Sequence, residues 1–467
     1  MKAENCIDEF IYEGVDVVLE ADQTIEDIEI DGITELINYK NLTIQKVNEI
    51  TSLTVNGDIR NEVGASIIVD SSSVILDGKL HNDGTLTLKD ATITMTGRGS
   101  VENAYVMTTE GQTFVTRITN ANNCINCGED KALLTVVDGK LTTNMLLNHD
   151  KVVVNEDAAL EANVMTNFGT MDISGEATFV DGKNYSTMTI EATGSVWEDY
   201  DPQQTSNVLC NYNGAVINVK GSLTENIKNA GEIFVIENGI VIVNGKPTGD
   251  TGLNGIIDIS EANAGAPAQA ARDMGGVNHN YFRYTVGTET TATALQEALK
   301  LRISSDNWGT AKNPIILVWG ENSATSFAGT MTEANVERII IENDLVIEAK
   351  EGTNVVVTKF GELNDNDWSN PANSPSAAVN KALWVKEGAS LYVNAYATLE
   401  LVEGAAGAQE PLHVQVDGTF KANDQSLVKG TTVVVDGDST GKVYVGNDPA
   451  TFEWNKGTFT GKWSGIE

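Results

Sequence analysis

Short segments of alternating apolar and polar residues follow one another along the first 260 residues. Val15–Leu19, Ser66–Val69 and Thr170–Ile173 are examples, and β-branched residues are frequent in them. Such alternation buries one face of a β-strand and leaves the other in solvent. Pairs such as Asn56-Gly57 and Asp138-Gly139 separate the segments, and these residue types suit tight turns. The pattern predicts a succession of short strands.

One motif, apolar-x-Asn-x-Gly, recurs just before several of these segments. Its asparagines are 21, 85 and 62 residues apart, close to one, four and three steps of 21. A repeat period in the twenties is typical of stacked, quasi-one-dimensional folds. The copies are Ile59-Arg60-Asn61 leading to Gly64, Leu80-His81-Asn82-Asp83-Gly84, Met165-Thr166-Asn167-Phe168-Gly169 and Ile227-Lys228-Asn229-Ala230-Gly231.

A 21-residue step can hold three short strands and three turns, which is one rung of a parallel β-helix with rungs about 4.8 Å apart. The repeat therefore favours an all-β fold, a right-handed parallel β-helix (β-solenoid), over an antiparallel sandwich that would use the same turn dipeptides. Asparagines stacked at one turn position could bond along the axis, or they could be turn formers only. This structural turn ladder would comprise Asn61, Asn82, Asn167 and Asn229.

The pattern changes after residue 260. Residues 261–285 are rich in small residues and read as a connector, and residues 291–302 place Leu295 and Leu299 on one face of a helix with Thr291 or Thr293 as N-cap. Strand-like segments resume at 314–319 and 336–348. We expect a β-solenoid over 1–260, a connector and capping helix over 261–302, and a second solenoid segment over 303–467. One continuous solenoid with an insertion is the alternative.

The charge balance excludes some partners. The formal net charge is −36, from 66 acidic and 30 basic residues, which repels nucleic acid and anionic membranes. Either solubility or binding of divalent cations outside the cell would account for it. No apolar run is long enough to span a membrane, and no signal peptide is visible before Cys6, so the chain could be a mature domain behind an artificial Met1.

The four cysteines do not form a zinc-site pattern. Cys124 and Cys127 make one C-x-x-C pair, but no second pair exists and the four histidines are far apart in the sequence. We interpret the pair as part of a loop that could carry a disulfide in an exported protein.

Catalytic patterns are weak. A polysaccharide lyase needs a base and a cation near its intermediate, and no arginine lies in a basic and acidic cluster. A hydrolase on this fold needs paired carboxylates on adjacent rungs, whereas Asp70, Asp172 and Asp258 occur singly. No catalytic residues are therefore assigned.

Two acidic loops could hold Ca²⁺, the one cofactor that we consider. Asp365, Asp367 and Ser369 match positions 1, 3 and 5 of a calcium loop, but Asn370 and Ser376 replace the usual Gly and Glu. A solvated insertion loop explains the segment better than a calcium loop does. The acidic residues Glu198, Asp199 and Asp201 form a lesser candidate.

Tryptophans gather in the second half of the chain. Exposed aromatic rings can stack on sugars or anchor protein contacts, so Trp308, Trp368 and Trp384 are candidate ligand-binding residues. Packing beneath loops or at solenoid ends is the alternative, and it suits Trp319, Trp454 and Trp463 better.

The Asn-x-Gly rungs and the helix-then-strand pattern near residue 294 resemble exported bacterial β-solenoid proteins, namely adhesin-type passenger domains and surface proteins of gut bacteria. This resemblance implies an extracellular or cell-surface location and a non-catalytic role in adhesion, binding of a polysaccharide or surface protein, or spacing. The alternative is a polysaccharide lyase or glycoside hydrolase on a β-helix. A cleft lined by three or more carboxylates would favour the enzyme.

Overall fold

The computed structural model forms two compact units, one comprising residues 1–228 and 243–245 and the other residues 229–242 and 246–467. Each is described by itself. The described residues are 2–3, 15–27, 29–122, 132–197, 208–225, 227–243, 255–263, 268–270, 281–303, 315–329, 336–349, 356–357, 383–394, 397–401, 412–416, 418–422, 427–430, 433–436, 442–445, 451–454 and 459–460.

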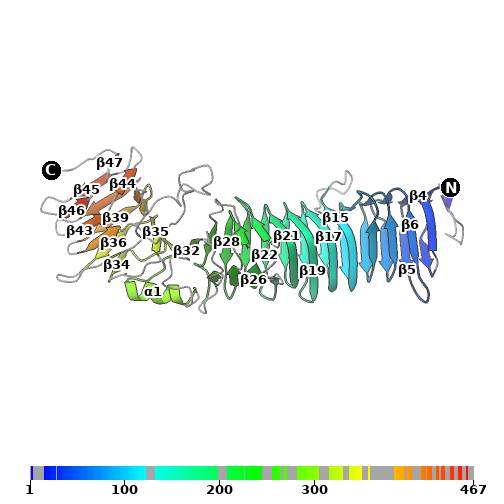
Figure 1. Ribbon diagram of the computed structural model, residues 1–467, viewed down its shortest axis with the longest axis horizontal. Coiled ribbons are helices and arrows are strands. Elements are labelled where there is room, and N and C mark those ends of the chain that lie inside the picture. Colours follow the sequence, from blue (N-terminus) through cyan, green and yellow to red (C-terminus); the bar gives the residue numbers. More distant parts are fainter. Residues whose placement is uncertain are drawn as a thin grey trace. The chain divides into compact units, whose positions relative to one another are not determined.

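The first unit is a parallel β-solenoid, in which each rung contributes three strand segments (Figure 1). One rung, for example, consists of β10 (Leu80–Asn82), β11 (Thr85–Lys89) and β12 (Thr92–Met95), and each pairs in parallel with its counterparts one rung before and one rung after. This confirms the fold class expected from the alternating pattern and the Asn repeat.

The strands form three stacks. The first includes β2 (Val15–Leu19), β7 (Ile59–Asn61), β10, β13 (Val101–Asn103) and β24 (Val208–Asn211). The second comprises β3 (Gln23–Glu26), β5 (Asn41–Gln45), β8 (Ser66–Asp70), β11, β14 (Val106–Glu110), β16 (Leu133–Val136), β18 (Lys151–Val154), β20 (Thr170–Ile173), β22 (Thr187–Ile190) and β25 (Val216–Val219). The third includes β6 (Ser52–Val55), β9 (Ser73–Leu76), β12, β23 (Ser195–Trp197) and β26 (Ser222–Glu225).

Five long strands run through both the third and the first stack, and the short strand β1 (Lys2–Ala3) pairs with β2. The long strands are β4 (Glu29–Asn38), β15 (Gln112–Asn120), β17 (Gly139–Asn148), β19 (Ala158–Asn167) and β21 (Glu176–Asn184). At the division between the units lie β27 (Ile227–Asn229) and β29 (Ile240–Val243).

The core of this unit is built from every second residue of each strand. In β11, Leu86 and Leu88 are fully buried, while the alternate residues Thr85 and Thr87 face outward. Because the strands pair in register, the inward aliphatic side chains stack into continuous columns, and burying each contributes about 1.5–3 kcal/mol. The sequence alternation is therefore the direct cause of the buried aliphatic interior of the rungs.

A ladder of buried asparagines runs along one corner of the solenoid. From Asn38 to Asn184, each side chain amide donates to the side chain carbonyl of the asparagine one rung later, at 2.7–2.9 Å. The second amide hydrogen donates to a backbone carbonyl, as Asn82 does to Val106 at 2.8 Å. The members are Asn38, Asn61, Asn82, Asn103, Asn120, Asn148, Asn167, Asn184 and Asn211.

The rungs are not of one length. Asn82 and Asn167 are four rungs apart, but the steps are 21, 17, 28 and 19 residues. A uniform step of 21 is therefore wrong for this stretch, although the number of rungs inferred from it is correct. Turns can lengthen or shorten because the register is set by the strands and by the asparagines.

The second unit also consists of parallel stacks. The longest described stack contains β28 (Glu232–Val235), β30 (Ile256–Asp258), β32 (Tyr281–Thr285), β33 (Ile315–Trp319), β35 (Val336–Ile341), β38 (Leu383–Val385), β41 (Leu412–Val416), β44 (Val433–Asp436) and β47 (Phe459–Thr460). A short strand, β31 (Ala268–Ala270), also lies in this unit.

Two further stacks complete the later rungs of this unit. One holds β34 (Ser326–Ala328), β36 (Leu345–Glu348), β39 (Ser390–Val393), β42 (Thr419–Ala422) and β45 (Lys442–Val445). The other holds β37 (Val356–Val357), β40 (Thr398–Leu401), β43 (Leu427–Gly430) and β46 (Thr451–Trp454).

The expected helix is present as α1 (Ala292–Lys300), with Thr291 as its N-cap and Leu295 and Leu299 buried. It lies in the chain between β32 and β33, which pair directly with each other. Thr291 forms a bridge with Ala328 at the end of β34. The helix thus lies in the connection between two adjacent strands of the long stack, beside β34. Strands of the same unit precede it in the chain.

Candidate functional site

A row of three charged or titratable side chains faces outward near the asparagine ladder. Arg60, His81 and Glu102 occupy the middle of β7, β10 and β13, between an inward aliphatic residue and an inward asparagine. The strands pair so that His81 lies opposite both Arg60 and Glu102. The variable residue x of the apolar-x-Asn motif therefore lies on the surface, and the x residues of successive rungs are neighbours.

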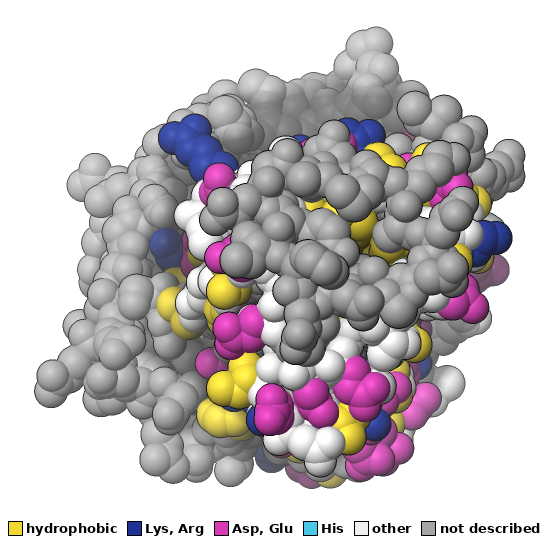
Figure 2. Space-filling view, turned by 90° about the vertical axis from the view of Figure 1, so that its right-hand side faces the viewer, with side chains coloured by type: hydrophobic (Ala, Val, Ile, Leu, Met, Phe, Trp, Pro, Cys, Tyr) yellow, Lys and Arg dark blue, Asp and Glu magenta, His cyan; other side chains and the backbone are white. Residues whose placement is uncertain are grey.

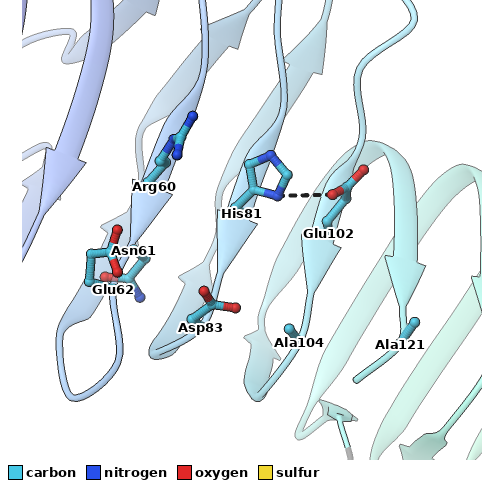
Figure 3. A pocket seen from close by; sticks show the side chains of 8 residues that line it. All are labelled: Arg60, Asn61, Glu62, His81, Asp83, Glu102, Ala104 and Ala121. Atoms are coloured by element: carbon cyan, nitrogen blue, oxygen red, sulfur yellow. Dashed lines mark ion pairs between the residues drawn. The ribbon is translucent and has the colours of Figure 1, made fainter. Parts of the chain in front are cut away.

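The residues that follow the ladder asparagines form a second row, at the adjacent corner. Here the successive rungs carry Glu62, Asp83, Ala104 and Ala121. Together the two rows line a hollow of about 210 Å³ (Figure 3). Ala104 and Ala121 are buried, so the polar side chains dominate the accessible lining.

Ion pairs orient the polar groups of the hollow. The Nδ1 atom of His81 lies 2.9 Å from Glu102 Oε2, and Lys79 Nζ lies 2.6 Å from the other oxygen of Glu102. Arg60 Nε contacts Glu35 at 2.9 Å. The bond with Glu102 raises the pKa of Lys79 above its usual value of 10.5, so this lysine remains charged near neutrality. These groups are half-exposed, and their pairing energies are correspondingly small.

The hollow can offer hydrogen bonds from several directions. Its carboxylates are Glu62, Asp83 and Glu102, and Arg60 and His81 add donors. Within the described ranges, no three His, Cys, Asp or Glu side chains are close enough together to hold a metal ion. The chemistry that this arrangement supports is recognition of hydroxyl or amine groups by partly solvated polar side chains.

The corner row continues as a stack of aromatic rings. His149 stacks on Phe168 at 5.1 Å between ring centroids, Phe168 on Tyr185 at 4.8 Å, and Tyr185 on Tyr212 at 4.1 Å, with interplanar angles of 10–15°. A hydrogen bond with Tyr185 is the main factor that raises the pKa of Tyr212. Phe168 and Tyr185 each have a ring on both faces, so these faces are not open platforms for sugars.

Several residues singled out in the sequence lie outside the described residues. These are Trp308, Trp368, Asp365, Asp367, Ser369, Glu198, Asp199, Asp201, Cys6, Cys124 and Cys127. The calcium loop and two of the three candidate tryptophans thus stay predictions.

Trp384 is described and is partly buried. Its ring packs against a cluster of Ile316, Val318 and Ile340 on the outer face of the long stack of the second unit. The Lys386 ammonium lies over the ring at 5.1 Å from its centroid. One ring face is therefore occupied by a cation, which leaves less of the indole for a ligand.

The structure does not bring the three single aspartates together. Asp70 lies at the end of β8, Asp172 pairs with Lys151 at 3.0 Å, and Asp258 pairs with Arg283 at 2.6 Å. Each belongs to a different rung and to its own ion pair or turn. Asp70 and Asp172 are partly exposed strand residues, whereas Asp258 is buried beside Arg283.

The hollow and the aromatic stack were not identified from the sequence. A signal for the stack exists, because every ring directly follows a ladder asparagine, as in Asn167-Phe168 and Asn184-Tyr185. Asn229, the fourth asparagine of the motif, is also buried and donates to the carbonyl of Ile256 at 3.3 Å. The glycine that the motif has two positions after its asparagine is not a general feature of the ladder. Lys40 and Asp150 stand at that position after Asn38 and Asn148, and their backbone amides donate to the side chain oxygens of these asparagines.

No protein-family model, characterised protein or solved structure matches this sequence. The parallel rungs and the asparagine ladder show the β-solenoid architecture itself. In the part of the chain that the structure describes, no helix is long and apolar enough to cross a membrane.

Proposed function

We propose that this chain is a non-catalytic β-solenoid of the cell surface or extracellular space, which acts in adhesion by holding a glycan-binding surface on its stacked rungs. The observation that carries the proposal is the unbroken asparagine ladder from Asn38 to Asn211, with strands in register along it. From Asn38 to Asn211, each rung is tied to the next by backbone and side chain bonds, which suits a load-bearing spacer.

The surface supports the same proposal. Ion pairs such as Lys140–Glu161 and Lys151–Asp172 connect neighbouring rungs on the outside. Figure 2 faces the right-hand side of Figure 1, and acidic side chains, in magenta, are spread over the described part of that face. This agrees with the net charge of −36. A strongly acidic surface keeps an exposed solenoid soluble and discourages contact with anionic polymers.

One observation favours a second candidate function, a polysaccharide lyase or glycoside hydrolase. Three carboxylates, Glu62, Asp83 and Glu102, line the same hollow as His81 and Arg60, which is the kind of grouping that an acid and base pair requires. Against it, Glu102 is already engaged by Lys79 and His81. The space is also small for a polymer that must be cleaved within it.

Incubation with a panel of neutral and acidic polysaccharides distinguishes the two candidates. We expect retention of the protein on one or more neutral polymers, with no new reducing or unsaturated ends, because Glu102 in the hollow is already paired with Lys79 and His81. The measurement is co-sedimentation together with end-group analysis of the supernatant. New ends that disappear in the Asp83→Asn variant, but not in Asp172→Asn, would establish the enzyme instead.

A further inference from the structure

Two tyrosines form the closest ring contact of the described aromatic stack. Tyr185 and Tyr212 directly follow the ladder asparagines Asn184 and Asn211, which pair in register on adjacent rungs and whose side chains are bonded at 2.9 Å. The centroids of the two tyrosine rings are 4.1 Å apart, and the angle between the ring planes is 10°. The register of the strands therefore holds two phenol rings in van der Waals contact.

The hydroxyl groups of the two rings lie at the same end of the pair. A hydrogen bond joins the side chains of Tyr185 and Tyr212. Because the rings are nearly parallel, this bond also brings together the ring carbons that flank each hydroxyl. Phe168, which stacks on the other face of Tyr185, has no hydroxyl. The contact between the two tyrosines thus differs chemically from the other ring contacts described along the corner.

The tyrosine pair is accessible from solvent. The side chain of Tyr185 is 38% exposed, and Tyr212 is partly exposed. The exposed part of Tyr185 is its edge, since Phe168 and Tyr212 cover its two faces. A phenol is readily oxidised by the loss of one electron and one proton. A diffusible one-electron oxidant can therefore reach the pair and oxidise it at the corner.

We propose that Tyr185 and Tyr212 are a site of oxidative cross-linking, at which a peroxidase with hydrogen peroxide joins the two rings as dityrosine. Each phenol gives up one electron and one proton and becomes a tyrosyl radical. The two radicals form a bond between one carbon beside each hydroxyl, and the hydrogens on these carbons move to the oxygens and restore the phenols. One hydrogen peroxide takes up the two electrons and two protons and becomes two water molecules.

Fixed proximity favours this product over links between molecules. Rings held on adjacent rungs react as a unimolecular pair, at an effective concentration far above that of a second chain. The net charge of −36 also keeps copies of the chain apart. The rings must turn so that their edges meet, and the ring torsion of an aromatic side chain has a broad range.

The product is a covalent link between β21 and β24. It lies beside the hydrogen bond from Asn184 to Asn211 and joins residues that are far apart in the sequence. Such a link restricts the unfolded chain, as a disulfide does, and stabilises the folded one. Cross-linking would therefore reinforce the scaffold in an oxidising environment, and it does not depend on glycan binding.

Treatment of the full chain with a haem peroxidase and hydrogen peroxide, followed by mass spectrometry of peptides, tests the site. We expect one major cross-linked pair, Tyr185 with Tyr212, in a monomeric chain that shows dityrosine fluorescence. Tyr185→Phe and Tyr212→Phe keep both rings but remove one phenol, and each should lower this fluorescence at least about tenfold. Tyr39→Phe is the matched control and should react as the parent chain does. Tyr39 is 50% exposed at the same corner of an earlier rung, where its neighbour on the next rung is Glu62 rather than a ring.

Cross-links that form only between chains, or that are spread over other tyrosines, would overturn the site. Undiminished fluorescence in a folded Tyr185→Phe chain would do so too, with folding checked by circular dichroism. Cys210 lies two residues before Tyr212 on the same strand, and a thiol can reduce a tyrosyl radical, so Cys210→Ser should give at least the yield of the parent chain. The treated parent should also unfold at a higher urea concentration than treated Tyr185→Phe, and equal midpoints would contradict a stabilising link.

Discussion

Replacing Asn120 by alanine should destabilise the first unit by about 3–5 kcal/mol, because it breaks the ladder in its middle. Asn120 is fully buried, accepts from Asn103 at 2.8 Å, and donates to Asn148 and to the carbonyl of Lys151, both at 2.8 Å. The substitution leaves an amide of Asn103 and two carbonyl oxygens without this partner in a dry interior. The midpoint of urea unfolding, followed by far-ultraviolet circular dichroism, measures the loss.

The chain offers a matched control for this substitution. Asn163 donates to Asn144 one rung away at 3.1 Å, but this pair is exposed to solvent. Asn163→Ala should therefore cost less than about 0.5 kcal/mol, since water replaces the lost partner. Equal effects of the two substitutions would show that the buried ladder contributes nothing beyond an ordinary surface bond.

Replacing Gly139 by alanine should destabilise the first unit by at least about 3 kcal/mol. Gly139 has φ +65°, and a Cβ there would lie 2.3 Å from the carbonyl oxygen of Gly111 on the preceding rung. Backbone cannot yield as a side chain can, so the two rungs must separate, which disturbs the pairing of Gly139 with Ala158 on the other side. Urea unfolding of the variant measures the effect.

Gly64 offers a control that separates the strain of a positive φ from the steric clash with the neighbouring rung. It has φ +80°, and a Cβ there would meet nothing within 4 Å. Gly64→Ala should therefore show only the strain of a left-handed backbone, about 1–2 kcal/mol. If Gly139→Ala were no worse than Gly64→Ala, the close approach of rungs at Gly111 would not exist in solution.

The fold class was predictable because it depends on features that repeat. Alternation within strands such as Thr85–Lys89 fixes which side chains are buried, and the asparagines fix the corner at which rungs align. The helix at 292–300 was equally legible from its two leucines and its threonine cap. These are local signals, and each is confirmed by the structure.

The candidate site was not predictable, because it depends on rung lengths that follow no rule. Ala104, Ala121 and His149 share a corner only because the rungs around Asn120 have 17 and 28 residues. A search for a constant step of 21 aligns other residues there. The motif also required a glycine two positions after the asparagine, and no glycine stands there after Asn103, Asn120 or Asn148. The side chain of the asparagine, rather than a glycine, holds the turn.

The central claim, that a continuous ladder of buried carboxamides ties the rungs into one scaffold, can be tested directly by hydrogen exchange of asparagine side chains. The chain would be labelled with ¹⁵N at asparagine Nδ2 and transferred into D₂O, with Asn163→Ala and Asn120→Ala used for assignment. We expect a set of side-chain amide signals, those of the ladder, to persist for hours, while the signal of Asn163 is lost within the dead time. Loss of all asparagine side-chain signals at the rate of exposed amides would contradict the ladder and the scaffold built on it.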